Sequence, residues 1–127
     1  MWATCSPEQT SVTDKPVDAD SWAAMLEAVR AFHHKHRFRE TGGEELTYRV
    51  ALMAEELGEI SSCVSKGKST ETLAEEVADL LILLMGTGIA ADFDLNAAFW
   101  EKMEKLMRRE ARMVGGRIRV SDFRDMG

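Results

Sequence analysis

The stretch EELGEISSCVSKGKSTETLAEEVAD, residues 55–79, decides how the chain folds. It holds two acidic runs, at 55–59 and 75–79, separated by a break rich in Gly, Ser and Lys at 66–70. Within each run two acids are three positions apart, so a helix would place both on one face. These acids are Glu56 and Glu59 in the first run and Glu76 and Asp79 in the second.

The break predicts a hairpin of two helices with its centre near Lys68. Glu59 is nine residues before Lys68, and Glu76 is eight after it. Glu56 is twelve residues before Lys68, and Asp79 is eleven after it. At a rise of about 1.5 Å per residue, antiparallel helices place Glu59 level with Glu76, and Glu56 level with Asp79. The four carboxylates are therefore expected to form one cluster at two adjacent levels.

An apolar stripe runs along the first helix of this hairpin, which is predicted over about 44–66. Its members are spaced four, three, four, three and four residues apart: Leu46, Val50, Met53, Leu57, Ile60 and Val64. Such a stripe is typical of a helix face that packs in a core. Glu56 and Glu59 lie beside it on a flank shared with Cys63, and the acids of the second helix share a flank with Leu83.

Four like charges on half-apolar flanks repel one another, and burying them without partners is costly. A hard divalent cation removes that conflict, and oxygen-only ligands favour Mg²⁺, Mn²⁺ or Ca²⁺ over zinc. A solvated face is the alternative for either acidic run taken by itself. A di-iron carboxylate bundle needs Glu-x-x-His motifs, whereas the histidines, at 33, 34 and 36, lie outside both helices. The joint placement of the two runs favours a metal site.

The remaining helices are predicted from caps and breaks. The first begins at Asp20 or Ser21 and runs to about residue 37, before the break at 41–43. Ser69 or Thr70 caps the third, which ends between 86 and 91. A fourth runs from Asp94 to about 113, where two glycines stop it, and no alternation typical of a strand has useful length. Short loops between long amphipathic helices predict an all-α, antiparallel four-helix bundle, completed by oligomerisation.

Three segments are expected. Residues 1–18 are polar, aperiodic and contain both prolines, so we interpret them as a disordered or loosely docked arm. Residues 19–114 are expected to form one helical domain, and 115–127 a short basic tail. The 127 residues have room for one core.

The overall charge of −6 comes from 16 basic and 22 acidic residues, and it argues against long nucleic acids or anionic membranes as partners. The charge is unevenly distributed: residues 44–79 carry 3 basic and 9 acidic side chains, giving −6, whereas 101–127 carry 8 and 5, giving +3. No apolar stretch is long enough for a membrane span, and no signal peptide is visible. Two cysteines in different contexts predict no disulfide framework, so a cytoplasmic setting is expected.

The acidic pattern resembles that of the MazG-like, all-α nucleoside triphosphate pyrophosphohydrolases. EExxE begins at Glu55, sixteen residues follow, and ExxD begins at Glu76. The likeness covers about residues 21–113, including the segment FDLNAAFWEKMEKLMRRE at 93–110.

The resemblance implies Mg²⁺-dependent hydrolysis of a nucleoside triphosphate to its monophosphate and pyrophosphate, with Mn²⁺ as a substitute. It also implies a homodimer or homotetramer with sites near subunit interfaces. Matched position by position, Glu55 is the acid that orients or deprotonates the attacking water. The matched metal ligands are Glu56, Glu59, Glu76 and Asp79. Phosphoanhydride cleavage needs cations that neutralise the phosphates and activate water, so the chemistry agrees.

Basic side chains for the phosphates are expected on the fourth helix, where they recur at helical spacing: Lys102, Lys105, Arg108, Arg109 and Arg112. We predict substrate contacts for Lys102, Lys105 and Arg109, with a solvated face as the alternative. Lys105 matches a lysine of the family, but Leu106 stands where the family has asparagine. Lys35 and Phe38 are further candidates, because flat and basic groups bind bases and phosphates; a core position is the alternative for Phe38.

Three further functions stay open on sequence alone. Two lie within the family: a dUTP- or dCTP-selective enzyme, and a phosphoribosyl-ATP pyrophosphohydrolase. The third is a helical interaction module without catalysis, which would be recognised by the loss of an acid from the cluster. No acid is lost from the pattern here.

Overall fold

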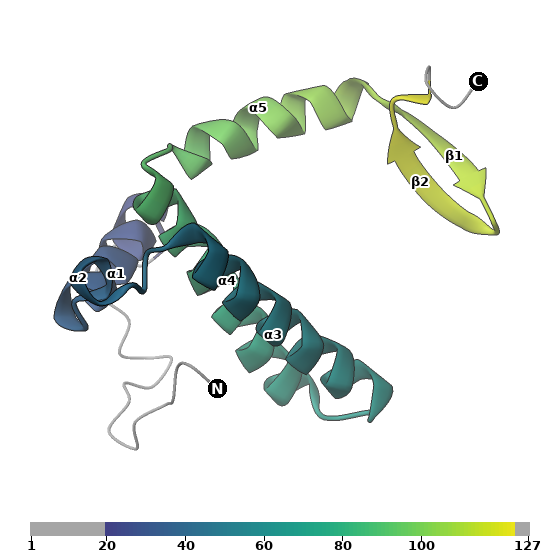
Figure 1. Ribbon diagram of the computed structural model, residues 1–127. Helices are drawn as coiled ribbons and strands as arrows, with labels where there is room; N and C mark the ends of the chain where they lie inside the picture. The colour runs from purple at the N-terminus through teal and green to yellow at the C-terminus, as the bar shows by residue number, and fades with distance from the viewer. Residues whose placement is uncertain (1–19, 124–127) are drawn as a thin grey trace. The chain divides into compact units, whose positions relative to one another are not determined.

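The computed structural model describes residues 20–123, which form five helices and one two-stranded hairpin (Figure 1). The N-terminal arm predicted over 1–18 lies outside these residues. The described chain divides into two units, the first ending at Phe93 and the second beginning at Asp94. The described residues are mostly helical, which agrees with the all-α prediction apart from the one hairpin. A four-helix bundle would also need the last helix to pack on the first unit, and that arrangement stays a prediction.

The predicted helical hairpin is the centre of the first unit. Helix α3, Leu46–Ser65, and helix α4, Thr70–Ala91, lie side by side and antiparallel (Figure 1). The Glu45 carboxylate caps α3 by accepting from the amides of Thr47 and Tyr48. The Ser69 hydroxyl caps α4 by accepting from the Thr72 amide, so Ser69 rather than Thr70 is the cap of the two predicted. These caps satisfy amide groups that a helix N-terminus leaves without intrahelical partners.

The orientation of α3 differs from the predicted one. Members of its apolar stripe are exposed rather than packed on α4: Leu57 is 59% exposed and Val64 66%. The face that packs instead contains Arg49, Glu56 and Cys63, each seven residues from the next and all buried. The stripe is a real apolar surface that the other helices of the first unit do not cover.

On α4 the buried face includes Asp79, Leu83 and Met85, with Gly86 and Gly88. Leu83 is fully buried, and truncating such a side chain removes its contacts and leaves a cavity. We expect Leu83→Ala to cost about 2–5 kcal/mol in the free energy of unfolding, measured by urea denaturation. Met107→Ala is the control, because Met107 is 79% exposed and its truncation should cost less than about 1 kcal/mol. Equal losses in both variants would contradict the packing described here.

The first helix is shorter than predicted. Helix α1, Trp22–Lys35, is capped by Ser21, whose hydroxyl accepts from the Ala24 amide. The chain then leaves the helix through Arg37, which has a positive φ of 53°, and forms the short helix α2, Phe38–Thr41. Gly42, at φ 88°, ends α2 at the predicted break.

The second unit contains a correction. Helix α5, Leu95–Arg108, begins at the predicted cap Asp94 but ends five residues before the expected 113. Strands β1, Glu110–Val114, and β2, Arg117–Ser121, follow as an antiparallel pair (Figure 1). Both glycines between them, at 115 and 116, have positive φ, which is the two-residue turn that suits a hairpin. Residues 117–121, predicted as part of a tail, are therefore a strand.

Candidate metal centre

Three of the predicted metal ligands come together between α3 and α4. Glu56 reaches from α3, and Glu76 and Asp79 from α4. One carboxylate oxygen from each lies within 4.8 Å of the other two. Glu56 and Asp79 are expected at the same height along the helical hairpin, and this grouping agrees with that expectation. Glu76, one turn before Asp79 on α4, lies close to both.

Burial separates this cluster from an ordinary acidic surface. Glu56 is 0% exposed and Asp79 is 7% exposed. Four buried oxygens have no hydrogen-bond partner among residues 20–123: both oxygens of Glu56, Oε2 of Glu76 and Oδ2 of Asp79. Native proteins pair nearly all buried polar atoms, so four orphaned acceptors at one point call for an explanation.

Burial and mutual repulsion raise the pKa values of two of these carboxyl groups. Burial, together with the charges of Asp79 and Glu76, raises the pKa of Glu56 to about 7. Burial, together with the charges of Glu76 and Glu75, raises the pKa of Asp79 to about 6. Near neutral pH the cluster therefore holds protons that solvated carboxylates would have lost.

The donor set fits a hard divalent cation. Every orphaned atom is a carboxylate oxygen, the ligand type that Mg²⁺ and Mn²⁺ prefer. A cation would supply the positive charge that the buried acids lack, and it would take up the unused lone pairs.

The other two acids of the EExxE pattern lie differently. Glu55 and Glu59 are both exposed on α3. Glu59 is not part of the group whose oxygens lie within 4.8 Å. Its role as a fourth ligand, and that of Glu55 toward water, stay predictions.

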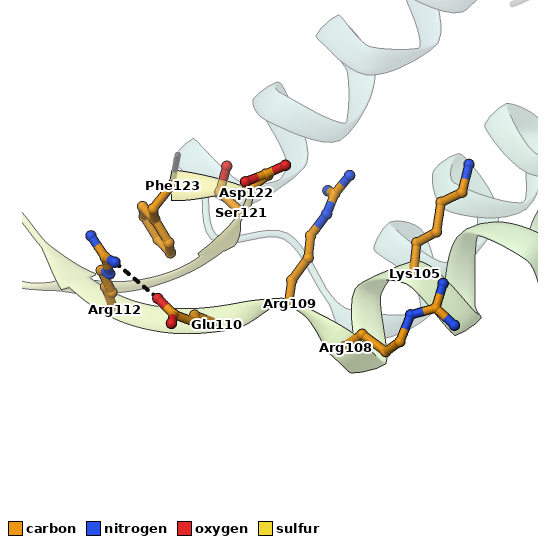
Figure 2. Close-up of a pocket in the computed structure, with 8 residues that line it drawn as sticks. All are labelled: Lys105, Arg108, Arg109, Glu110, Arg112, Ser121, Asp122 and Phe123. Carbon is orange, nitrogen blue, oxygen red and sulfur yellow. Dashed lines mark hydrogen bonds and ion pairs between the residues drawn. The ribbon is translucent and has the colours of Figure 1, made fainter. Parts of the chain in front are cut away.

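The basic residues of the C-terminal region lie in the second unit, and the hairpin changes their arrangement. Arg109 ends α5 and Arg112 belongs to β1, so the helical spacing predicted for them is wrong beyond Arg108. Lys105 and Arg109 line a pocket of about 540 Å³ within this unit (Figure 2). Lys102, also exposed on α5, does not line that pocket.

Two of the four cations lining this pocket already have carboxylate partners. Arg108 pairs with Glu104 at 2.7 Å, and Arg112 pairs with Glu110 at 2.9 Å while its guanidinium lies over the ring of Phe123 (Figure 2). For Lys105 and Arg109 no such partner occurs within residues 20–123. Their charges are therefore available to an anion.

The remaining candidates lie at the end of α1 and in α2. Lys35 is exposed at the last residue of α1. Phe38 packs edge-on against Phe32 with ring centroids 5.1 Å apart and is partly exposed, so both its predicted substrate contact and the core alternative stay open. Phe38 also lines a hollow of about 440 Å³ with Tyr48 and Leu52. Leu52 is one turn before Glu56 on α3, which places this hollow next to the acidic cluster.

Sequence reasoning did not single out Arg49. It is 1% exposed and lies two turns before Glu56 on the same face of α3. The available signal was the seven-residue spacing of Arg49, Glu56 and Cys63, which competed with a more regular apolar stripe.

The fold and the site define a helical domain with a buried carboxylate cluster between two antiparallel helices. The profile of the MazG nucleotide pyrophosphohydrolase domain matches residues 44–114, more than half of the chain, so the protein belongs to this family. The match includes α3, α4, α5 and β1. No curated protein and no solved structure matches the chain. Within residues 20–123 there is no helix of the length and apolarity that a membrane span requires.

Proposed function

We propose that the protein is a Mg²⁺-dependent nucleoside triphosphate pyrophosphohydrolase, acting on a ribo- or deoxyribonucleotide in the cytoplasm. The observation that carries this proposal is the set of four buried, orphaned carboxylate oxygens between α3 and α4. Membership of the MazG nucleotide pyrophosphohydrolase family supports the reaction class. The products are the nucleoside monophosphate and pyrophosphate, a reaction suited to removing surplus or non-standard nucleotides.

Each acid has a separate role in the proposed reaction. Glu56, Glu76 and Asp79 hold Mg²⁺, or Mn²⁺ in its place, and Glu59 completes the set from the next turn of α3. The bound cation supplies positive charge to the triphosphate and lowers the pKa of water. Glu55 is exposed, so it can reach solvent and accept a proton from the attacking water. The water oxygen would form a bond to the α-phosphorus while the anhydride bond between the α- and β-phosphates breaks, so that the monophosphate keeps the new oxygen and pyrophosphate leaves.

The rest of the nucleotide needs contacts outside the acidic cluster. We assign Lys105 and Arg109 to the phosphates because both have free charges facing one pocket, and Lys102 because it is exposed on the same helix. The hollow lined by Phe38, one turn from the cluster, suits a flat base that stacks on an aromatic ring. Lys35, the last residue of α1, is exposed and available to a phosphate.

The exposed apolar stripe of α3 supports the predicted homodimer or homotetramer. Apolar side chains on α4 are exposed as well, including Val77 and Leu84. Large contiguous apolar patches are uncommon on soluble monomers and mark interaction surfaces. A second copy of the chain would cover them and would complete the helical packing that one copy leaves open.

The proposal is tested by incubating the protein with Mg²⁺ and each nucleoside triphosphate in turn and identifying the products by ³¹P NMR. We expect pyrophosphate and the monophosphate in equal amounts. A preference for dUTP or dCTP, or activity confined to phosphoribosyl-ATP, would assign the enzyme within its family. Orthophosphate as the only released species, or no turnover of any nucleotide tested, would contradict the proposal, and the second outcome would favour an interaction module.

A further inference from the structure

Arg49 is buried on the face of α3 that carries Glu56, two turns before that residue, and the proposed reaction gives it no role. Its guanidinium donates three hydrogen bonds in three directions. Nε donates to the Thr87 hydroxyl at 3.1 Å, and Nη2 donates to the Leu83 carbonyl oxygen at 2.8 Å. Nη1 donates to the Gly43 carbonyl oxygen at 3.0 Å. Arg49 therefore joins the start of α3 to two successive turns of α4.

The axial offset between α3 and α4 that these hydrogen bonds require is the same offset that brings the acidic residues together. On α3, Glu56 follows Arg49 by seven residues. On α4, Asp79 precedes Thr87 by eight, and Glu76 precedes Leu83 by seven. Because the helices are antiparallel, equal distances along each lead from the Arg49 contacts to the carboxylates. Sliding α3 by one turn, about 5.4 Å, would break the Arg49 bonds and separate Glu56 from its partners.

The groups around Arg49 leave space for its guanidinium in one position. A Cβ atom at Gly86 would collide with Nη2 of Arg49 and Nε2 of His33, so only glycine leaves space for them. The Thr87 hydroxyl that accepts from Arg49 itself donates to the Leu83 carbonyl at 2.7 Å. A planar guanidinium offers its donors in fixed directions, so it satisfies this set of acceptors at one axial offset.

We propose that Arg49 is a positioning residue for the acidic cluster: its hydrogen bonds to Thr87 and Leu83 fix α3 against α4 at the offset that brings Glu56 beside Glu76 and Asp79, and its bond to Gly43 holds the guanidinium in place. Loss of Arg49 lets the helices settle at another offset, in which the repelling carboxylates move apart. The purpose of the cluster rests on the proposed function. The positioning itself is a property of the metal-free protein.

The test compares Arg49→Met and Arg49→Lys with Cys63→Ala. Cys63 is a matched control, because it is buried on the same face of α3, seven residues after Glu56 rather than seven before it. Its truncation removes packing but no hydrogen bond between the helices, so a merely structural effect would appear there too. The first readout is the crystal structure of each metal-free variant, and the second is Mn²⁺ affinity measured by electron paramagnetic resonance.

In Arg49→Met we expect the three carboxylates to leave the arrangement within 4.8 Å. Mn²⁺ affinity should fall by about 10-fold or more, the size of effect seen when groups that orient metal ligands are removed. Cys63→Ala should keep the carboxylate arrangement and bind Mn²⁺ within about twofold of wild type. Arg49→Lys should recover part of the affinity, because its ammonium can still donate to the Leu83 carbonyl.

Carboxylates that stay together in Arg49→Met would overturn the proposal, as would equal loss of Mn²⁺ affinity in Arg49→Met and Cys63→Ala. If Arg49→Met does not fold, Arg49→Lys and Thr87→Val decide, since Thr87→Val removes one acceptor and keeps the arginine. Unchanged carboxylate positions in both would also overturn it. Absence of Mn²⁺ binding in the wild type would count against the proposed metal site alone, because the metal-free structures still report on Arg49.

Discussion

Glu56→Gln is expected to lower Mg²⁺-dependent pyrophosphate release by about 100-fold or more, because it removes the charge of the most deeply buried of the proposed ligands. Glutamine keeps the size and one oxygen of the side chain, so the loss would report on charge rather than packing. The measurement is the initial rate at saturating Mg²⁺, together with Mn²⁺ affinity, which should fall in parallel. Wild-type activity and affinity in this variant would contradict the ligand assignment.

The same substitution should stabilise the metal-free protein. The pKa of Glu56 is raised from 4.5 to about 7, so ionising this carboxylate near pH 8 costs the folded state free energy that the unfolded state does not lose. Removing that cost should raise the metal-free Tm at pH 8 by about 5 °C. A variant with less activity and more stability is the behaviour expected of a strained functional group.

The neighbouring Glu55 supplies the matched control. Glu55 is exposed, whereas Glu56 is fully buried, although the two are adjacent in sequence. Glu55→Gln should therefore leave the metal-free Tm and Mn²⁺ affinity unchanged while lowering the rate of hydrolysis. Identical behaviour of the two variants would show that the distinction between metal ligand and water-activating acid is wrong.

Metal affinity should depend steeply on pH, and this is the second large effect. Glu56, with a pKa of about 7, and Asp79, with a pKa of about 6, must both lose their protons before they can bind a cation. Treated as independent groups, these values predict a rise of about 20-fold in Mn²⁺ affinity between pH 6 and pH 8. Affinity that does not change over this range would contradict the raised pKa values.

The stability of the metal-free protein should change with pH in the opposite sense. Because both pKa values are higher in the folded state, the folded protein binds more protons than the unfolded chain between about pH 4 and pH 7. The stabilising contribution is complete below the unfolded values and is lost as pH rises through the folded values. Tm measured in EDTA should therefore fall from pH 5 to pH 8, and Glu56→Gln should flatten the slope.

The hairpin and the meeting of three of the four expected acids could be predicted from the sequence because both depend on local spacing. The caps at Ser69 and Asp94 and the break at Gly67 fix where the helices begin and end. Once α3 and α4 were antiparallel, counting from the loop placed Glu56 opposite Asp79. The orientation of α3 could not be predicted in this way, because periodicity shows that an apolar face exists but not which chain covers it.

Two other features escaped prediction for different physical reasons. The basic residues from Lys102 to Arg112 recur at helical spacing, which concealed that Arg112 lies in a strand. The signal that could have revealed the strand is the turn at Gly115 and Gly116, flanked by alternating apolar and basic residues. Arg49 escaped because its role depends on the Leu83 and Gly43 carbonyls, and backbone acceptors leave no trace in the sequence.

The central claim is that the buried carboxylates between α3 and α4 bind a divalent cation. Its most direct test is the anomalous difference map of a crystal of the full chain soaked in Mn²⁺. A peak is expected among the oxygens of Glu56, Glu76 and Asp79, at about 2.0–2.4 Å from them, and it should be absent from Glu56→Gln. No peak there, or peaks only at exposed acids such as Glu71, would contradict the claim.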